Sequence, residues 1–177
     1  MDFKWNADFN VIFAASASGK TTMAKKYDNV IDLIGGAYKF LDFDLANDEL
    51  QKGRFCQLNP NYPNNYIDAI IQAAKDKNKL LLLPLNKSAH DGFVPELHKR
   101  GLRFAIAFRT DLQEVEEIMR SRGNNDDFMK KVLGNYESNI ASIVKLSEAV
   151  IVIPKGQHLE DALVEYMNSG MGKLAAE

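Results

Sequence analysis

A run of small residues followed by a lysine and two threonines lies near the N-terminus and could bind phosphate. It spans Ala14–Thr22, and Gly19, Lys20 and Thr21 match the end of the phosphate-loop pattern, Gly-x-x-x-x-Gly-Lys followed by Ser or Thr. Such a glycine lets backbone approach the phosphate, the lysine brings a positive charge, and the hydroxyl reaches Mg²⁺. Ala14 replaces the first glycine, which is tolerable while φ stays negative. We therefore predict a nucleoside triphosphate site formed by Ala15, Ser16, Ala17, Ser18, Gly19, Lys20, Thr21 and Thr22.

The same letters would also suit a helix that begins here without binding a ligand. Ser18 would then be an ordinary N-cap residue. The flanking segments favour the nucleotide site. Apolar Phe9–Ala15 is typical of a buried strand, and Gly19–Tyr27 is typical of a helix because it contains no helix breaker.

The rest of the chain alternates between short apolar runs and helical segments. This alternation predicts an α/β fold, in which a parallel sheet is sandwiched by helices. Residues 34–64 are the least regular stretch, and residues 170–177 are predicted to be a loose tail after a single domain at 1–169. The further predicted strands are Asn29–Leu33, Lys79–Leu85, Leu102–Phe108 and Ala149–Ile153, and the further helices are Asn65–Lys77, Val94–Arg100, Asp111–Ser121, Asp126–Leu146 and Leu159–Met167.

Charged residues at the ends of these elements are further candidates for chemistry. Asp32 lies near the end of the second predicted strand, and the carboxyl ends of parallel strands border the ligand crevice. A carboxylate there can accept from a hydroxyl, although a solvated strand-end aspartate is an alternative. Arg120 and Arg122 precede Gly123 between two predicted helices, and an arginine fork can bind two phosphate oxygens. Complementing the helix dipole is their alternative role.

The third predicted strand lacks the aspartate that often follows it in nucleotide sites and helps to hold the metal ion. Leu80–Pro84 ends without an aspartate, and Asn86 or Ser88 would organise metal-bound water more weakly. Together with Ala14, this leaves open a weakened or lost turnover.

The composition limits the kinds of partner and the cellular location that we expect for this protein. The 177 residues carry a net charge of −2, which argues against a nucleic-acid partner because such a ligand normally requires a basic surface. The longest apolar run, Leu80–Leu85, is too short to span a membrane. The single cysteine excludes an internal disulfide and fits a reducing, cytoplasmic location.

We interpret three acidic residues as a solvated helix face: Glu114, Glu116 and Glu117.

The chain resembles the small P-loop nucleoside and nucleotide kinases of the shikimate-, adenylate- and gluconate-kinase type. It is most similar to small kinase-like proteins encoded by bacteriophages, which would place it in the host cytoplasm. Four segments carry the resemblance: residues 14–22, Val30–Leu33, Arg120–Asn125 and Ile151–Gly156. The resemblance implies a five-stranded parallel sheet of order 2-3-1-4-5, with a lid near residues 118–130.

The resemblance also implies an activity. It is Mg-ATP-dependent phosphoryl transfer to a small acceptor, a nucleoside or nucleoside monophosphate, by a protein that could form a homodimer. The alternative is a catalytically weak or inactive nucleotide-binding regulator. The implied catalytic residues are Lys20, Asp32, Arg120 and Arg122, with Thr21 and Asp32 at the metal, Lys155 and Gly156 at the adenine, and Asp32, Tyr38, Lys39, Asp42 and Asp44 near the acceptor.

Overall fold

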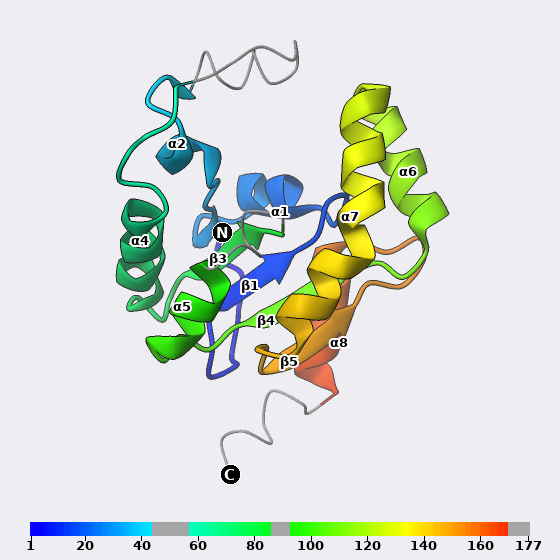
Figure 1. The fold of residues 1–177 in the computed structure, drawn as a ribbon. Helices are drawn as coiled ribbons and strands as arrows, with labels where there is room; N and C mark the ends of the chain where they lie inside the picture. The colour runs from blue at the N-terminus through cyan, green and yellow to red at the C-terminus, as the bar shows by residue number, and fades with distance from the viewer. Residues whose placement is uncertain (44–56, 86–92, 170–177) are drawn as a thin grey trace.

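Five strands form one parallel sheet in the computed structural model, which describes residues 1–43, 57–85 and 93–169. The strand order is β2-β3-β1-β4-β5, and each pair of neighbours is parallel (Figure 1). This confirms the predicted fold class and strand order. The strands are β1 Val11–Ala14, β2 Val30–Asp32, β3 Leu80–Pro84, β4 Ala105–Phe108 and β5 Ala149–Val152.

Helices follow the strands, and each helix predicted from the sequence is present with its ends shifted by a few residues. The stretch 34–64 was predicted to be irregular, but its described part contains the short helix α2, which ends with a hydrogen bond from Phe40 N to Gly36 O at 3.1 Å. No helix within the described ranges is both long and apolar enough to cross a membrane. The helices are α1 Lys20–Lys26, α2 Gly36–Lys39, α4 Asn64–Ala74, α5 Val94–Lys99, α6 Leu112–Ser121, α7 Asp126–Val144 and α8 Leu159–Asn168.

The central strand β1 is buried on both faces. Val11 and Phe13 point into a core built with α4, α5, α6 and α7. Ile12 and Ala14 point into a second core built with α1 and α8. A continuous apolar strand of this kind is typical of a parallel sheet with helices on both sides. The loop that follows β1 therefore starts from one of the most tightly packed parts of the molecule.

The helices α6 and α7 form a pair that projects beyond the sheet. Their tip and α2 lie on opposite sides of α1 (Figure 1). The Asp111 side chain caps α6 by accepting from the N–H groups of Gln113 and Glu114, and Asn125 caps α7 by accepting from Phe128 N at 2.8 Å. Gly123 separates the two helices with φ 77°, a left-handed conformation that glycine adopts without strain.

Candidate phosphate and acceptor site

The loop between β1 and α1 has the backbone of an anion-binding turn. Ala17 and Gly19 both have left-handed backbones, with φ 64° and 102°. Left-handed residues at a helix start build concave nests of N–H groups, and the positive helix end adds to their attraction for phosphate. The N-cap is Gly19, without a side-chain cap, so the prediction that Ser18 would be the N-cap residue is wrong.

Hydrogen bonds to β4 and α8 hold this loop. Ala15 N donates to Ala107 O on β4 at 2.9 Å, and Leu159 N at the start of α8 donates to Ser18 O at 2.9 Å. The Ser18 hydroxyl oxygen is buried without a hydrogen-bond partner among the described residues. An unpaired buried hydroxyl at such a loop fits a polar ligand group.

Lys20, Thr21 and Asp32 lie together at the start of α1. The Lys20 ammonium donates to Ala14 O at 3.2 Å, and the Thr21 hydroxyl donates to Asp32 Oδ2 at 2.9 Å. Burial lowers the pKa of Lys20, while the charge of Asp32 raises it and that of Arg122 lowers it further. The charges of Asp32 and Arg122, predicted from two other segments of the chain, therefore both act on Lys20.

The donor set at Asp32 fits a magnesium ion. Asp32 Oδ1 is buried and has no hydrogen-bond partner within the described ranges. Magnesium is commonly bound through one or two carboxylates together with substrate phosphates. No cluster of three or more His, Cys, Asp or Glu residues suited to a metal occurs in the described part of the chain. Phosphate oxygens would thus complete the ligand set of Thr21 and Asp32.

A cavity of about 330 Å³ lies beside the phosphate loop. Ala15, Ser16 and Lys20 form one wall, and the end of β3 forms another. Sequence reasoning did not identify the third wall, because apolar and amide side chains at helical spacing also occur on ordinary helices. It is one side of α7, formed by Phe128, Lys131, Val132, Asn135, Tyr136 and Asn139.

Arg109, at the end of β4, is a second feature that the sequence did not reveal. Its side chain is only 2% exposed, and its Nε donates to Ala17 O in the phosphate loop at 3.0 Å. Its Nη1 donates to Glu114 Oε1 at 2.8 Å. The interpretation of Glu114 as part of a solvated face is wrong, because this side chain is 11% exposed and Oε2 accepts from Gly156 N at 2.8 Å. Glu114 is buried because its two carboxylate oxygens are paired with the Arg109 guanidinium and the Gly156 N–H.

The two arginines that were predicted to belong to a lid have different surroundings. Arg120 is 61% exposed and pairs with Glu116 at 2.8 Å and Asp126 at 3.6 Å. Arg122 follows α6 as its C-cap residue, and its charge acts on Lys20. The structure therefore associates Arg122 more closely than Arg120 with the phosphate loop.

The turn after β5 lies across α6. Lys155 is 76% exposed, and its ammonium lies 3.4 Å from Asp111 Oδ2. The backbone N–H of Gly156 is used by Glu114. The structure gives these two residues protein partners, and their predicted position at the adenine stays a prediction.

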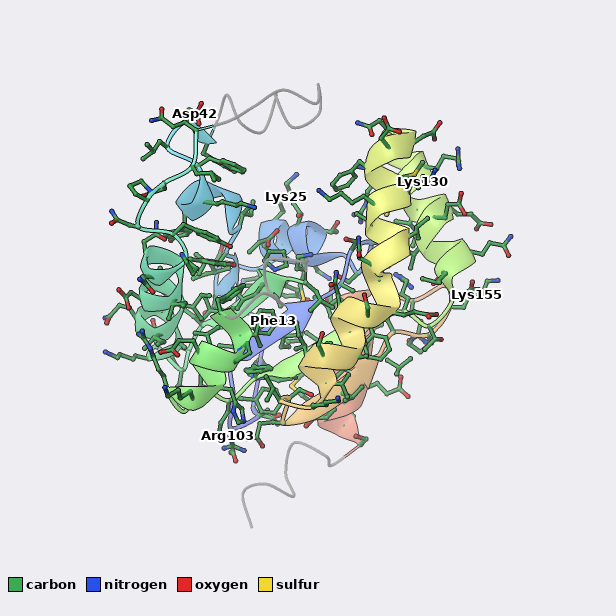
Figure 2. The ribbon with its side chains drawn as sticks, viewed as in Figure 1. Phe13, Lys25, Asp42, Arg103, Lys130 and Lys155 are labelled. Atoms are coloured by element: carbon green, nitrogen blue, oxygen red, sulfur yellow. The ribbon has the colours of Figure 1, made fainter. Side chains whose placement is uncertain are left out.

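The predicted acceptor residues of the 34–64 stretch lie on the other side of α1. Tyr38 stacks on Tyr66 with ring centroids 5.2 Å apart, and the Lys39 ammonium lies 5.5 Å from the Phe40 ring. Asp42 lies beyond α2, near the end of the described segment 34–43 (Figure 2), and Asp44 falls outside the described residues. None of the described ones lines the cavity at the phosphate loop.

Solved structures with the same architecture are known. The chain is similar to the tunicamycin resistance protein of Deinococcus radiodurans, with TM-score 0.54 and 16% identity over 92% of this chain and 96% of that chain. It is also similar to a gluconokinase from Sinorhizobium meliloti 1021, with TM-score 0.58 and 16% identity over 98% of this chain and 96% of that one. The sequence matches no protein-family model and no curated protein. These likenesses show that the chain shares its fold with these two proteins.

Proposed function

We propose that this protein transfers the γ-phosphoryl group of Mg-ATP to a small acceptor, a nucleoside or nucleoside monophosphate. The observation that carries the proposal is the hydrogen bond from Thr21 to Asp32 beside Lys20, at the end of a loop with two left-handed residues. The site thus combines a loop that can bind phosphate, a positive charge and a hydroxyl–carboxylate pair suited to magnesium.

The roles of the residues follow from their chemistry. The Lys20 ammonium neutralises phosphate oxygens, and Arg122 adds charge from the lid side. Bound magnesium, held through Thr21 and Asp32, would neutralise charge on the β- and γ-phosphates. Asp32 accepts the proton of the acceptor hydroxyl, whose oxygen then bonds to the γ-phosphorus as the bond to ADP breaks.

The cavity beside the loop suits an acceptor with an aromatic base. Phe128 is 48% exposed and lies on the cavity lining, where its ring could stack on a base. Asn135 and Asn139 offer amides for the polar edge of a base, and Lys131 offers a charge for a phosphate group. Because Ser16 and Lys20 share the cavity, an acceptor there would lie next to the transferable phosphate.

Binding without turnover is the second candidate function. The strand β3 ends at Pro84, and Leu85 is the last described residue after it, so no carboxylate follows β3 in the described part of this segment. Ala14, paired with Pro84 across the sheet, also replaces the first glycine of the loop pattern. The missing carboxylate would weaken metal handling more than nucleotide binding.

The deciding experiment incubates the purified protein and Mg-ATP with a panel of nucleosides and nucleoside monophosphates. We expect ADP release and a phosphorylated product with at least one acceptor, and loss of both in Lys20→Ala. Lys75→Ala, an exposed lysine next to the C-terminus of α4, is the matched control. ATP binding without consumption would support the regulator instead. No ATP binding by the wild-type protein would overturn both candidates.

A further inference from the structure

We infer that Arg109 is a positioning residue that holds the phosphate loop in its nucleotide-binding conformation. This inference rests on the proposed function only in that the loop binds a nucleotide; it does not depend on turnover. Arg109 contacts the loop through one backbone carbonyl, that of Ala17.

The first argument is the set of partners that surround the guanidinium. Besides Ala17 O at 3.0 Å, it donates to Glu114 Oε1 at 2.8 Å and to Pro154 O at 3.4 Å. A buried charge is tolerated only when it is paired and hydrogen-bonded. These contacts therefore fix the side chain in one place, and the fixed side chain ties the phosphate loop to the turn after β5.

The second argument is the backbone conformation of the residue that Arg109 contacts. Ala17 has φ 64° and is the one non-glycine residue with a positive φ in the described part of the chain. A residue with a Cβ is strained in this region and stays there only when its surroundings hold it. The bond from Arg109 to the Ala17 carbonyl is a direct means of holding it.

The third argument is that the contacts of Arg109 reach both α6 and α7. The Arg109 backbone N–H donates to the Tyr136 hydroxyl at 3.0 Å, and that hydroxyl donates to Arg109 O at 3.1 Å. Tyr136 belongs to α7 and lines the cavity. Glu114 belongs to α6 and also accepts from Gly156 N. Arg109 thus lies where the phosphate loop, the β5–α8 turn, α6 and α7 meet.

Most arginine–glutamate pairs on a protein surface contribute little to the free energy of folding. The chain contains one such surface pair, which serves for comparison. Arg100 donates to Glu96 Oε1 at 3.0 Å, close to the geometry of the Arg109–Glu114 pair, but its side chain is 39% exposed. The pair joins two positions at the end of α5 and makes no contact with the phosphate loop. Arg100→Met is therefore the matched control.

The test is a double-mutant cycle between positions 109 and 17, read by calorimetry of Mg-ATP binding. Glycine adopts the left-handed conformation without strain, so Ala17→Gly removes the need for an external brace. We expect Arg109→Met to weaken ATP binding at least tenfold. We expect Ala17→Gly to change the wild-type affinity less than threefold but to recover several-fold of the loss in the Arg109→Met background.

Fold integrity is checked by circular dichroism at the temperature of the titration. If Arg109→Met does not fold, Arg109→Lys keeps the charge but loses the fork, and the same cycle is run with it. If Arg109→Met caused only a general loss of stability, Ala17→Gly would relieve backbone strain equally in both backgrounds and would not recover ATP affinity selectively in the Arg109 variant. Equal effects of Ala17→Gly in both backgrounds, or wild-type affinity in the Arg109 variants, would overturn the inference. Failure of the proposed function would show differently, as absence of ATP binding in the wild-type protein.

Discussion

The Thr21 hydroxyl donates a hydrogen bond of 2.9 Å to Asp32 Oδ2, and this joins the start of α1 to the end of β2. The bond fixes one carboxylate oxygen and leaves Oδ1 buried without a partner among the described residues. Buried polar atoms are nearly always paired, and an unpaired one at a ligand site indicates a group supplied by the ligand. The pair therefore links metal handling to acceptor activation in the proposed reaction.

Asp32→Asn tests this role. The amide keeps the size of the side chain but cannot take up a proton, so we expect kcat to fall about 10²- to 10⁴-fold while ATP affinity changes only a few-fold. Steady-state phosphoryl transfer and calorimetry measure the two effects. Asp68→Asn, at an exposed carboxylate on α4, is the control. Full turnover by Asp32→Asn would exclude it as the base.

Lys20→Met should separate binding from folding. A hydrogen bond to a charged group contributes about 1.5–3 kcal/mol, so we expect ATP binding to weaken about ten- to a hundredfold. The melting temperature without nucleotide should not fall, because burial disfavours the charged lysine. Calorimetry and thermal unfolding check both results, with Lys75→Met as control. A large loss of stability would contradict this account.

The pKa of Lys20 predicts a linkage between nucleotide binding and pH. Burial lowers this pKa in the free protein, and bound phosphates would raise it because they favour the charged form. ATP binding should therefore take up protons at alkaline pH, and affinity should fall as pH rises through the lowered pKa. Calorimetry in buffers of different ionisation enthalpy measures the uptake, which should disappear in Lys20→Met.

The same shift predicts the direction of a change in stability. The unfolded chain has the ordinary, higher pKa for Lys20, so between the two pKa values the unfolded state binds more protons than the folded state. The contribution of Lys20 to the free energy of unfolding of the nucleotide-free protein therefore rises with pH over that interval. Denaturant unfolding of wild type and Lys20→Met across alkaline pH isolates this contribution. A fall with rising pH would contradict the sign.

The two lid arginines should differ in effect. Arg122→Gln removes a charge that acts on Lys20, and loss of one preorganised donor to a transition-state charge typically lowers kcat about 10²- to 10³-fold. Arg120 pairs with Glu116 and Asp126, so Arg120→Gln should change kcat only a few-fold. Steady-state kinetics of both variants decide this. Equal losses would indicate that both arginines reach the phosphates once the lid closes.

Phe128→Ala tests the acceptor cavity. Loss of ring stacking should raise KM for a nucleoside acceptor about tenfold, equivalent to about 1.4 kcal/mol, and leave ATP affinity unchanged. Because Phe128 is 48% exposed, the free energy of unfolding should change little. Acceptor and ATP titrations separate the two effects. An unchanged KM for every acceptor tested would remove this ring from the acceptor site.

The sequence alone determined the features that depend on local chemistry. The phosphate loop was predictable because its glycine, lysine and threonine act within one strand–loop–helix unit. The parallel sheet and its strand order were predicted too, the first from alternating apolar runs and helices and the second from the family resemblance, and both are confirmed. The sequence also placed Lys20 and Asp32 near the carboxyl ends of β1 and β2, which open on the same edge of the parallel sheet, and the charge of Asp32 acts on Lys20 in the structure.

The tertiary structure alone decided which distant residues support that loop. Arg109 and Glu114 look like ordinary surface residues in the sequence, and only packing between β4, α6 and the phosphate loop buries their ion pair. The cavity wall on α7 is likewise invisible in the sequence, because amides and an exposed phenylalanine acquire a role only when the helix faces Lys20. Such partners are separated by up to 92 positions along the chain, so no local spacing pattern can encode their contact.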